Sequence, residues 1–287
     1  MRIATWNVNS LKARLDRVEE WLGIASPDVL LMQETKLFDE TAPVMPFAMA
    51  GYELAHHGQG RWNGVAIASR VGIADVVTNF GDGPVVGTSA GSGAGLDGGP
   101  AEEAASESGG TADDGIGPEA RMISARCGGI RVVSIYAPNG RALDTPFYEA
   151  KLSWFDRLSR WLEETQDPAG DLLIGGDFNV APDDLDVYDP RAYIGATHVS
   201  PAERAALARM RDWGLVDLVR PYHPETGFYT WWDYRAGNFH KNLGMRIDHL
   251  YATRSVAERV TGAERDRDAR KGKLPSDHAP LYVDLAG

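Results

Sequence analysis

The chain has 287 residues, 43% hydrophobic and 24% charged, with a formal net charge of −12. This composition is typical of a globular protein and excludes collagen-like, wholly disordered and disulfide-scaffold chains, while the length allows two domains or one large α/β domain at about 150 residues per domain. The negative charge disfavours a protein held on nucleic acid by bulk positive charge, and the single cysteine, Cys127, cannot form an internal disulfide.

The first 70 residues alternate between strand and helix patterns. Residues 2–8 predict a strand, and the apolar spacing of residues 11, 15, 18 and 22 predicts an amphipathic helix. Short apolar runs at 28–33 and 64–69 are typical of strands buried on both faces. His56 and His57 are adjacent, so their side chains diverge, and we expect both in a loop or at the surface.

Residues 81–118 form an insertion of unusual composition. The segment has 12 glycines, seven acidic residues, no Lys or Arg and no aromatic residue. It cannot bury enough apolar area to offset its ordering entropy, so we expect a flexible surface insertion rather than a domain linker. A neutral expansion is favoured over an autoinhibitory role for the insertion.

After the insertion the alternation resumes. Gly128-Gly129 between two apolar runs predicts a hairpin, and residues 171–176 predict another buried strand. Thr145-Pro146 opens a second helix. Ser200-Pro201-Ala202-Glu203 combines a capping box with proline at the first helical position, and that helix is predicted to end near Gly214. Mixed strands and helices predict an α/β or α+β fold.

Eight polar side chains lie at the ends of these predicted strands. Such side chains are rigidly held and converge in a cleft in many α/β folds. Taken singly, a residue such as Asn7 or Tyr136 has an ordinary reading as a helix cap or a hairpin-end aromatic. The set consists of Asn7, Glu34, Tyr136, Asp177, Asn179, Asp248, Asp277 and His278.

Carboxylates and amides of this kind favour a magnesium-type cation, which prefers oxygen ligands. Zinc would require more histidine or cysteine, and the chain has seven histidines, one cysteine and no HxxxH or CxxC spacing. A glycine-rich phosphate loop followed by Lys-Ser or Lys-Thr is absent, as is GxSxG.

Nine segments in order resemble the motifs of the exonuclease III family of abasic-site endonucleases, within the endonuclease/exonuclease/phosphatase superfamily. They cover nearly the whole chain outside 81–118 and read WNVNSLKAR, PDVLLMQETK, GVAIAS, YAPNG, GDFNVAP, WGLVD, TWWDY, MRIDHLYA and LPSDHAP. The resemblance implies one catalytic domain over residues 1–287, not two, with the flexible insertion at 81–118. Its fold would be a four-layered sandwich, two mixed β-sheets packed face to face with helices on the outside. It also implies hydrolysis of the phosphodiester 5′ to an abasic site with Mg²⁺ or Mn²⁺, and 3′-to-5′ exonuclease and 3′-end trimming on duplex DNA.

The same resemblance implies roles for single residues. Glu34 in QETK corresponds to the principal metal ligand, with Asn7 beside it binding metal or phosphate, while Asp177, Asn179 and Asp277 are further candidates for metal binding. For Asn7 and Asp277, supporting the ligands from behind is the alternative to direct binding. Asp177 would accept a proton from the attacking water or orient it, and Asn179 would donate to that water or to the transition state. Asp277-His278 resembles a carboxylate orienting an imidazole that donates to a phosphate oxygen. Tyr136 would lie near the phosphate, and Asp248 would support the hydrogen-bond network.

Two kinds of DNA contact are expected. An apolar pocket would hold the sugar that has lost its base, and nearby cationic side chains would contact phosphates. The pocket would be formed by Trp231, Trp232 and Met245, although a tryptophan pair is also common in a core. Arg141 and Lys241 would touch phosphates, as would Lys36, Arg235 and a basic run at 265–273 unless that run is simply solvated.

Two other functions remain open from the sequence. A superfamily phosphatase or sphingomyelinase acting on a lipid or inositol phosphate would share the same carboxylate and Asp-His core. A catalytically inactive binding module is disfavoured by the intact Glu34, Asp177, Asn179 and His278. No run approaches the ~20 apolar residues of a membrane span, and the N-terminus lacks a signal-peptide layout. We therefore expect a cytoplasmic protein with no membrane partner. We also expect a monomer.

Overall fold

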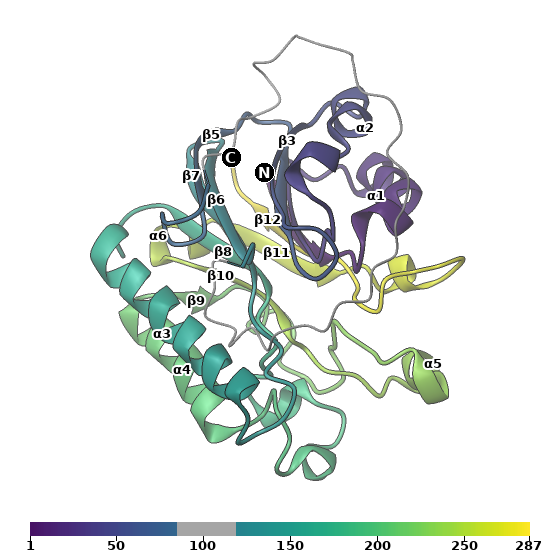
Figure 1. The fold of residues 1–287 in the computed structure, drawn as a ribbon, viewed down its shortest axis with the longest axis vertical. Helices are drawn as coiled ribbons and strands as arrows, with labels where there is room; N and C mark the ends of the chain where they lie inside the picture. The colour runs from purple at the N-terminus through teal and green to yellow at the C-terminus, as the bar shows by residue number, and fades with distance from the viewer. Residues whose placement is uncertain (85–118) are drawn as a thin grey trace, which may run out of the picture.

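Two mixed six-stranded sheets packed face to face form the centre of the protein in this computed structural model (Figure 1). The structure describes residues 1–84 and 119–287. Nearly all of the predicted insertion at 81–118 therefore lies outside the described residues. The two sheets and their outer helices confirm the predicted four-layered α/β sandwich.

The two sheets share one pairing pattern. Each has a central parallel pair, β1–β2 or β7–β8, flanked on both sides by antiparallel strands. The first sheet has the order β11 (Val260–Arg265), β12 (Leu281–Leu285), β1 (Arg2–Asn7), β2 (Val29–Gln33), β4 (Val65–Ser69), β3 (Glu53–His57). The second has the order β5 (Ala74–Thr78), β6 (Met122–Cys127), β7 (Ile130–Tyr136), β8 (Leu172–Asp177), β10 (Asp248–Ala252), β9 (Val216–Asp217).

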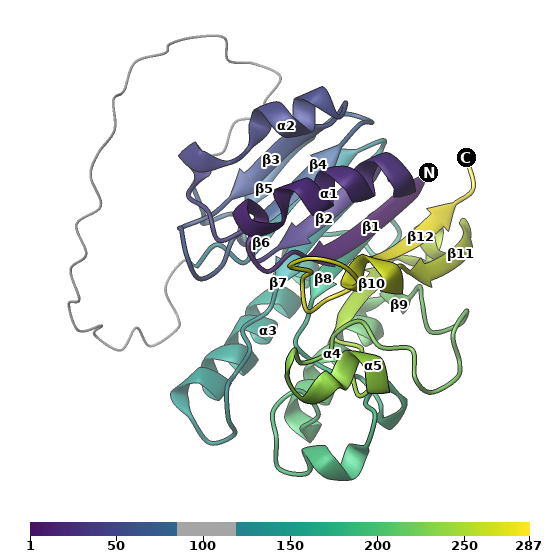
Figure 2. The same cartoon turned by 90° about the vertical axis from the view of Figure 1, so that its right-hand side faces the viewer.

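Helices cover the outer face of each sheet (Figure 2). Parallel neighbours need a crossover connection, and α1 and α3 supply it for β1–β2 and β7–β8. The first sheet carries α1 (Leu11–Ala25) and α2 (Val44–Met49), and the second carries α3 (Pro146–Thr165) and α4 (Pro201–Trp213). Two short helices, α5 (Asn238–Lys241) and α6 (Arg254–Ala257), lie in the C-terminal part of the chain. Among the described residues, no helix has both the length and the apolar character needed to span a bilayer.

Strand alternation separates the inner core from the two outer ones. In β1, Ile3 joins the core between the sheets, while Ala4 and Trp6 pack on the helix side. In β8, Leu173 points inward, and Gly175 follows on the same face. A Cβ at Gly175 would lie 2.7 Å from Leu250 Cδ2 and 2.8 Å from Leu31 Cδ1, so this glycine permits close approach of the sheets.

Local sequence signals located the principal elements correctly. Thr145 caps α3, Ser200 and Glu203 form the predicted capping box of α4, and Gly214 terminates that helix. Gly128 and Gly129 both have positive φ, 57° and 90°, as a two-residue hairpin turn requires.

The prediction for His56 and His57 was wrong. Both lie in β3 and are only 4% and 2% exposed. Hydrogen bonds supply the polar partners that burial of His56 requires: its Nε2 lies 2.8 Å from Thr35 Oγ1 and its Nδ1 lies 2.7 Å from Asp39 Oδ1. These hydrogen bonds join residues far apart in sequence. The adjacency of the two histidines therefore could not predict them.

Candidate active site

The predicted polar residues lie at one edge of the two-sheet sandwich. Asn7 ends β1, Glu34 follows β2, and Tyr136 and Asp177 end β7 and β8. Asp248 begins β10, which runs antiparallel to β8, so its first residue lies directly opposite Asp177 in the sheet register. The segment that enters β12 likewise brings Asp277 and His278 to the end of β1.

Glu34, Asp177 and His278 form the centre of this cluster. One ligand atom from each lies within 4.8 Å of the others, an arrangement that could hold a metal ion. Two carboxylates from different sheets suit a hard divalent cation with oxygen ligands. The donor set therefore fits Mg²⁺ or Mn²⁺ better than zinc.

Asn7 links the two carboxylates. Its side-chain Nδ2 donates to Glu34 Oε1 at 2.8 Å and to Asp177 Oδ2 at 2.9 Å, and its Oδ1 accepts from the backbone N–H of Asn9 at 3.0 Å. In this orientation Asn7 orders the two carboxylates rather than offering an oxygen to a cation. Of the two roles expected for Asn7, metal ligand or support for the ligands, these contacts match the supporting one.

The carboxylate that orients His278 is Asp248 rather than the expected Asp277. His278 Nδ1 lies 2.8 Å from Asp248 Oδ2, and both side chains are almost completely buried. Asp277 instead accepts from Asn9 Nδ2 at 2.9 Å and from Trp231 Nε1 at 3.0 Å. Asp277 is thus held by Asn9 and Trp231, while His278 turns to Asp248.

Charge in this buried cluster shifts two pKa values. Burial alone would lower the pKa of His278, but the carboxylates of Asp248, Asp177 and Asp277 overcome it and raise that pKa to about 10. Burial raises the pKa of Asp177, which Asp248 and Glu34 reinforce and His278 opposes. The raised pKa of His278 favours its protonated form, with its Nε2 3.8 Å from Asp177 Oδ2.

Tyr136 lies at the end of β7 and faces Glu34. Burial, followed by the Glu34 carboxylate, holds the pKa of Tyr136 well above its usual value. The phenol therefore stays protonated and can act as a hydrogen-bond donor. Its ring also packs against Arg121, whose guanidinium carbon is 4.8 Å from the ring centroid.

Asn179 belongs to a polar triplet that the sequence did not predict. Its backbone N–H donates to Asp177 Oδ1 at 2.9 Å, and its side-chain Nδ2 donates to the carbonyl of Ala137 at 2.9 Å. Its Oδ1 lies 3.3 Å from Asn139 Nδ2 and 3.1 Å from His198 Nε2. Asn139 was visible in the YAPNG motif, whereas His198 stands in a segment with no motif.

Asn9 and Lys36 connect Glu34 to Asp277. Lys36 Nζ lies 2.9 Å from Glu34 Oε2 and donates to Asn9 Oδ1 at 2.7 Å, and Asn9 in turn donates to Asp277. Asn9 lies within WNVNS, two residues after Asn7, and this spacing is the signal that could have identified it. Lys36 was expected to contact phosphate and in this structure pairs with Glu34.

The expected apolar pocket is only partly exposed. Trp231 is half-buried beside Asp277, but Trp232 is 0% exposed and donates from Nε1 to Asn242 Oδ1 at 3.1 Å. Met245 is 4% exposed and packs in a small core with Val187 and Ile247. Trp232 is thus a core residue, which corrects its expected role in binding the sugar.

The expected phosphate-binding cations divide into two groups. Arg141 and Lys241 are exposed, with Arg141 stacked 3.6 Å above the Phe147 ring centroid. Three arginines of the basic run donate to backbone carbonyls and stack on aromatic rings instead. These are Arg265, Arg267 and Arg270.

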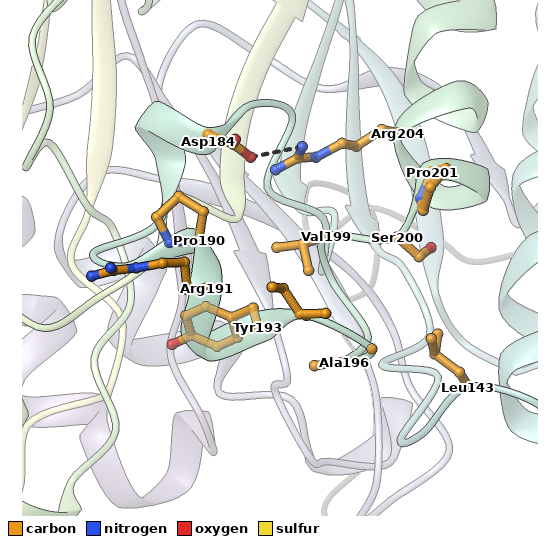
Figure 3. A pocket seen from close by; sticks show the side chains of 12 residues that line it. Leu143, Asp184, Pro190, Arg191, Tyr193, Ala196, Val199, Ser200, Pro201 and Arg204 are labelled. Atoms are coloured by element: carbon orange, nitrogen blue, oxygen red, sulfur yellow. Dashed lines mark ion pairs between the residues drawn. The ribbon is translucent and has the colours of Figure 1, made fainter.

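A separate cavity of about 520 Å³ lies beside the start of α4 (Figure 3). Its lining is largely apolar, with the Asp184–Arg204 ion pair of 2.9 Å at one side. Ala196, Val199 and Ser200 line it, while the intervening Thr197 and His198 bond toward Glu203 and Asn179. None of the eight predicted polar residues lines this cavity.

Comparison with known proteins gives consistent matches over the full length. The profile of the endonuclease/exonuclease/phosphatase family matches residues 4–278. Exodeoxyribonuclease III of Haemophilus influenzae is 30% identical and covers 99% of this chain and 100% of that protein. The 3′-5′ exonuclease NExo of Neisseria meningitidis superposes with a TM-score of 0.85 at 35% identity over 100% of both chains. An AP endonuclease from Archaeoglobus fulgidus gives 0.84 at 35% identity over 99% of both.

These matches agree with the site geometry, because the acidic cluster and eight of the nine ordered motifs fall inside the matched residues, which also reach Asp277 and His278 of the ninth. One of the solved structures similar to this chain, a 3′ phosphatase NExo variant from Neisseria at 35% identity, is bound to a product DNA hairpin, and the acidic cluster described above could hold a metal ion. The chain belongs to the endonuclease/exonuclease/phosphatase family, and it is a DNA repair nuclease of the exonuclease III and AP endonuclease group.

Proposed function

We propose that this nuclease cuts the phosphodiester 5′ to an abasic site in duplex DNA, and that it also acts as a 3′-to-5′ exonuclease and trims blocked 3′ ends with Mg²⁺ or Mn²⁺. The observation that carries the proposal is the meeting of Glu34, Asp177 and His278 within 4.8 Å. Glu34 and Asp177 would hold the cation, which when bound supplies charge neutralisation at the phosphate.

The protein side chains then have separate tasks. His278 would donate its Nδ1–H to Asp248 Oδ2 and its Nε2–H to a non-bridging phosphate oxygen. Asp177 orients the attacking water and accepts its proton, and the backbone N–H of Asn179 holds one oxygen of this carboxylate. Tyr136 donates a hydrogen bond near the phosphate.

We further propose that the chain works as one catalytic domain, a monomer, in the cytoplasm. Support for one domain comes from the site, which draws Glu34 and His278 from the first sheet and Asp177 and Asp248 from the second. The location is supported by relatives from the bacteria Haemophilus influenzae and Bacillus subtilis, named as exodeoxyribonucleases.

The decisive experiment uses a fluorescent duplex with one tetrahydrofuran residue, with Mg²⁺ or EDTA, and maps the cut end. We expect a cut 5′ to the tetrahydrofuran that EDTA abolishes. A parallel panel of phosphoinositides tests the alternative of a lipid or inositol phosphatase. Release from the phosphoinositides without cleavage of the duplex would overturn the proposal. The Asp177→Asn variant should lose cleavage, and full nicking by it would refute the role given to Asp177.

A further inference from the structure

A buried ion pair lies beneath the candidate active site and joins α3 to α4. Lys151 Nζ is 2.5 Å from Glu203 Oε1, and both side chains are 0% exposed. Burying two charges costs desolvation energy that their attraction does not reliably repay, so such a pair is weak evidence for stability. The role of this ion pair is therefore better read from the groups that it binds than from its contribution to stability.

The Lys151 ammonium donates hydrogen bonds to the backbone of two loops at the site. Besides Glu203, Nζ donates to the carbonyl oxygen of Asn179 at 2.7 Å and to that of Asn139 at 3.2 Å. An ammonium has three donors, and these three acceptors use all of them. The loops after β7 and β8 are thus tied to one atom.

Glu203 fixes a third segment in the same way. Its Oε1 accepts from Thr197 Oγ1 at 2.7 Å and from the backbone N–H of His198 at 2.9 Å. Its Oε2 accepts from the backbone N–H of Ser200 at 3.0 Å as part of the capping box. The carboxylate therefore determines where residues 197–200 lie relative to Lys151.

The three anchored segments carry side chains that meet above the pair. Asn139 Nδ2 lies 3.3 Å from Asn179 Oδ1 and 3.2 Å from His198 Nε2, and Asn179 Oδ1 lies 3.1 Å from His198 Nε2. Asn179 also holds Asp177 through its backbone N–H. The ion pair is connected to Asp177 through one residue.

We infer that Lys151 and Glu203 are positioning residues that preset Asn139, Asn179 and His198 toward Asp177 and the scissile phosphate. This inference rests on the proposed function and extends it to residues that do not touch substrate. Polar groups stabilise a transition state only when they are already oriented, and a misplacement of about 1 Å can cost about 10²-fold in rate. The pair is suited to that task because it binds mainly backbone atoms of these segments, so the side chains of Asn139, Asn179 and His198 can bond to one another.

The test removes both charges together, so that neither is left buried alone. In the Lys151→Met/Glu203→Leu variant we expect kcat on the tetrahydrofuran duplex to fall by about 10²-fold, the cost of misplaced groups. KM should change by less than about twofold, because neither residue touches the substrate. If the pair served stability alone, the double variant would have a lower unfolding temperature but would not show a large fall in kcat at nearly constant KM.

The matched control is the Arg209–Asp156 pair, which joins the same two helices on the surface. Its side chains are 50% and 60% exposed, so Arg209→Gln/Asp156→Asn should leave kcat unchanged. Amide hydrogen exchange gives a readout independent of activity. Exchange at 139–141, 178–180 and 197–200 should rise by about tenfold in the double variant but not in the control, as expected for local opening.

Two results would overturn the inference: a folded double variant with wild-type kcat, or unchanged exchange in the three segments. If the double variant does not fold, Glu203→Gln keeps an acceptor for Lys151 but loses the charge. It should lower kcat by about tenfold with KM unchanged, and a wild-type kcat would then contradict the inference. A wild-type chain that fails to cut the duplex would instead refute the proposed function, which separates the two failures.

Discussion

The contacts of His278 show how one residue assignment depends on sheet register. Asp277 is its neighbour in sequence, yet Asp248 is its partner, because β10 pairs with β8 so that Asp248 faces Asp177. Motif order pointed to Asp177, Asp248 and His278, and the strands bring these three side chains to one edge of the sandwich. Which carboxylate meets which nitrogen could not be predicted, since that depends on strand pairing rather than on local pattern.

Replacing Asp248 by Asn should reduce kcat by about 10³-fold, because the ring of His278 loses the anion that fixes its tautomer and charge. The control is Asp277→Asn, which removes a carboxylate bonded to Asn9 and Trp231 and should cost less. Steady-state cleavage of the same duplex by both variants decides the matter. A larger loss for Asp277→Asn than for Asp248→Asn would contradict this assignment.

At the scale of elements, the strands and capped helices follow from local signals. The capping box at Ser200 and Glu203 predicted α4 correctly, but it did not indicate that the same Glu203 pairs with Lys151 on α3. His56 is a similar case, because its partners Thr35 and Asp39 come from other segments. Pairing between elements depends on tertiary packing, which single-chain periodicity does not encode.

The loop after β2 should depend on His56 for its conformation. Thr35 follows Glu34, whose φ is 51°. One ring nitrogen of His56 is hydrogen-bonded to the hydroxyl of Thr35, and the other is hydrogen-bonded to the carboxylate of Asp39. His56→Asn should weaken Mn²⁺ binding by about tenfold, since partners that orient ligands typically contribute 10–100-fold to affinity. Titration calorimetry measures this, with His57→Asn on the opposite face of β3 as the control. Equal affinities for His56→Asn and wild type would refute the link.

The start of α3 offers a prediction about stability alone. Thr145 Oγ1 accepts from the backbone N–H of Tyr148 at 3.3 Å. Thr145→Ala should lower the free energy of unfolding by about 1 kcal/mol, as expected for loss of an N-cap. Thr145→Ser keeps the hydroxyl and should be close to wild type in urea denaturation. Neither change should alter kcat, and a fall in kcat without a change in stability would count against a purely structural cap.

At the scale of the whole molecule, the site exists only because two sheets meet. Gly175 lets the sheets approach, and Gln33 in β2 donates to Ser134 Oγ in β7 at 3.0 Å, beneath the catalytic edge. The net charge of −12 gives no attraction to DNA, so binding must rely on local cations at the rim. Arg141 and Lys241 are exposed and available for this purpose, whereas Arg270 is buried.

Local cations predict a modest but measurable salt dependence. Lys241→Ala should weaken duplex binding equally for all sequences and should reduce the slope of log affinity against log salt by about 1. Arg160→Ala, an exposed change on α3, serves as the control and should leave the slope unchanged. Fluorescence anisotropy at several salt concentrations gives both slopes. An unchanged slope for Lys241→Ala would exclude it from the phosphate contacts.

The central claim is that Glu34 and Asp177 jointly hold one divalent cation on which DNA cleavage depends. Calorimetric titration of Mn²⁺ into the wild type, Glu34→Gln and Asp177→Asn tests it most directly, with cleavage of the abasic duplex followed in the same samples. We predict one site in the wild type, binding weakened by at least about tenfold in each variant, and cleavage lost in parallel. Wild-type Mn²⁺ affinity in Glu34→Gln, or full cleavage by the wild type in excess EDTA, would contradict the claim.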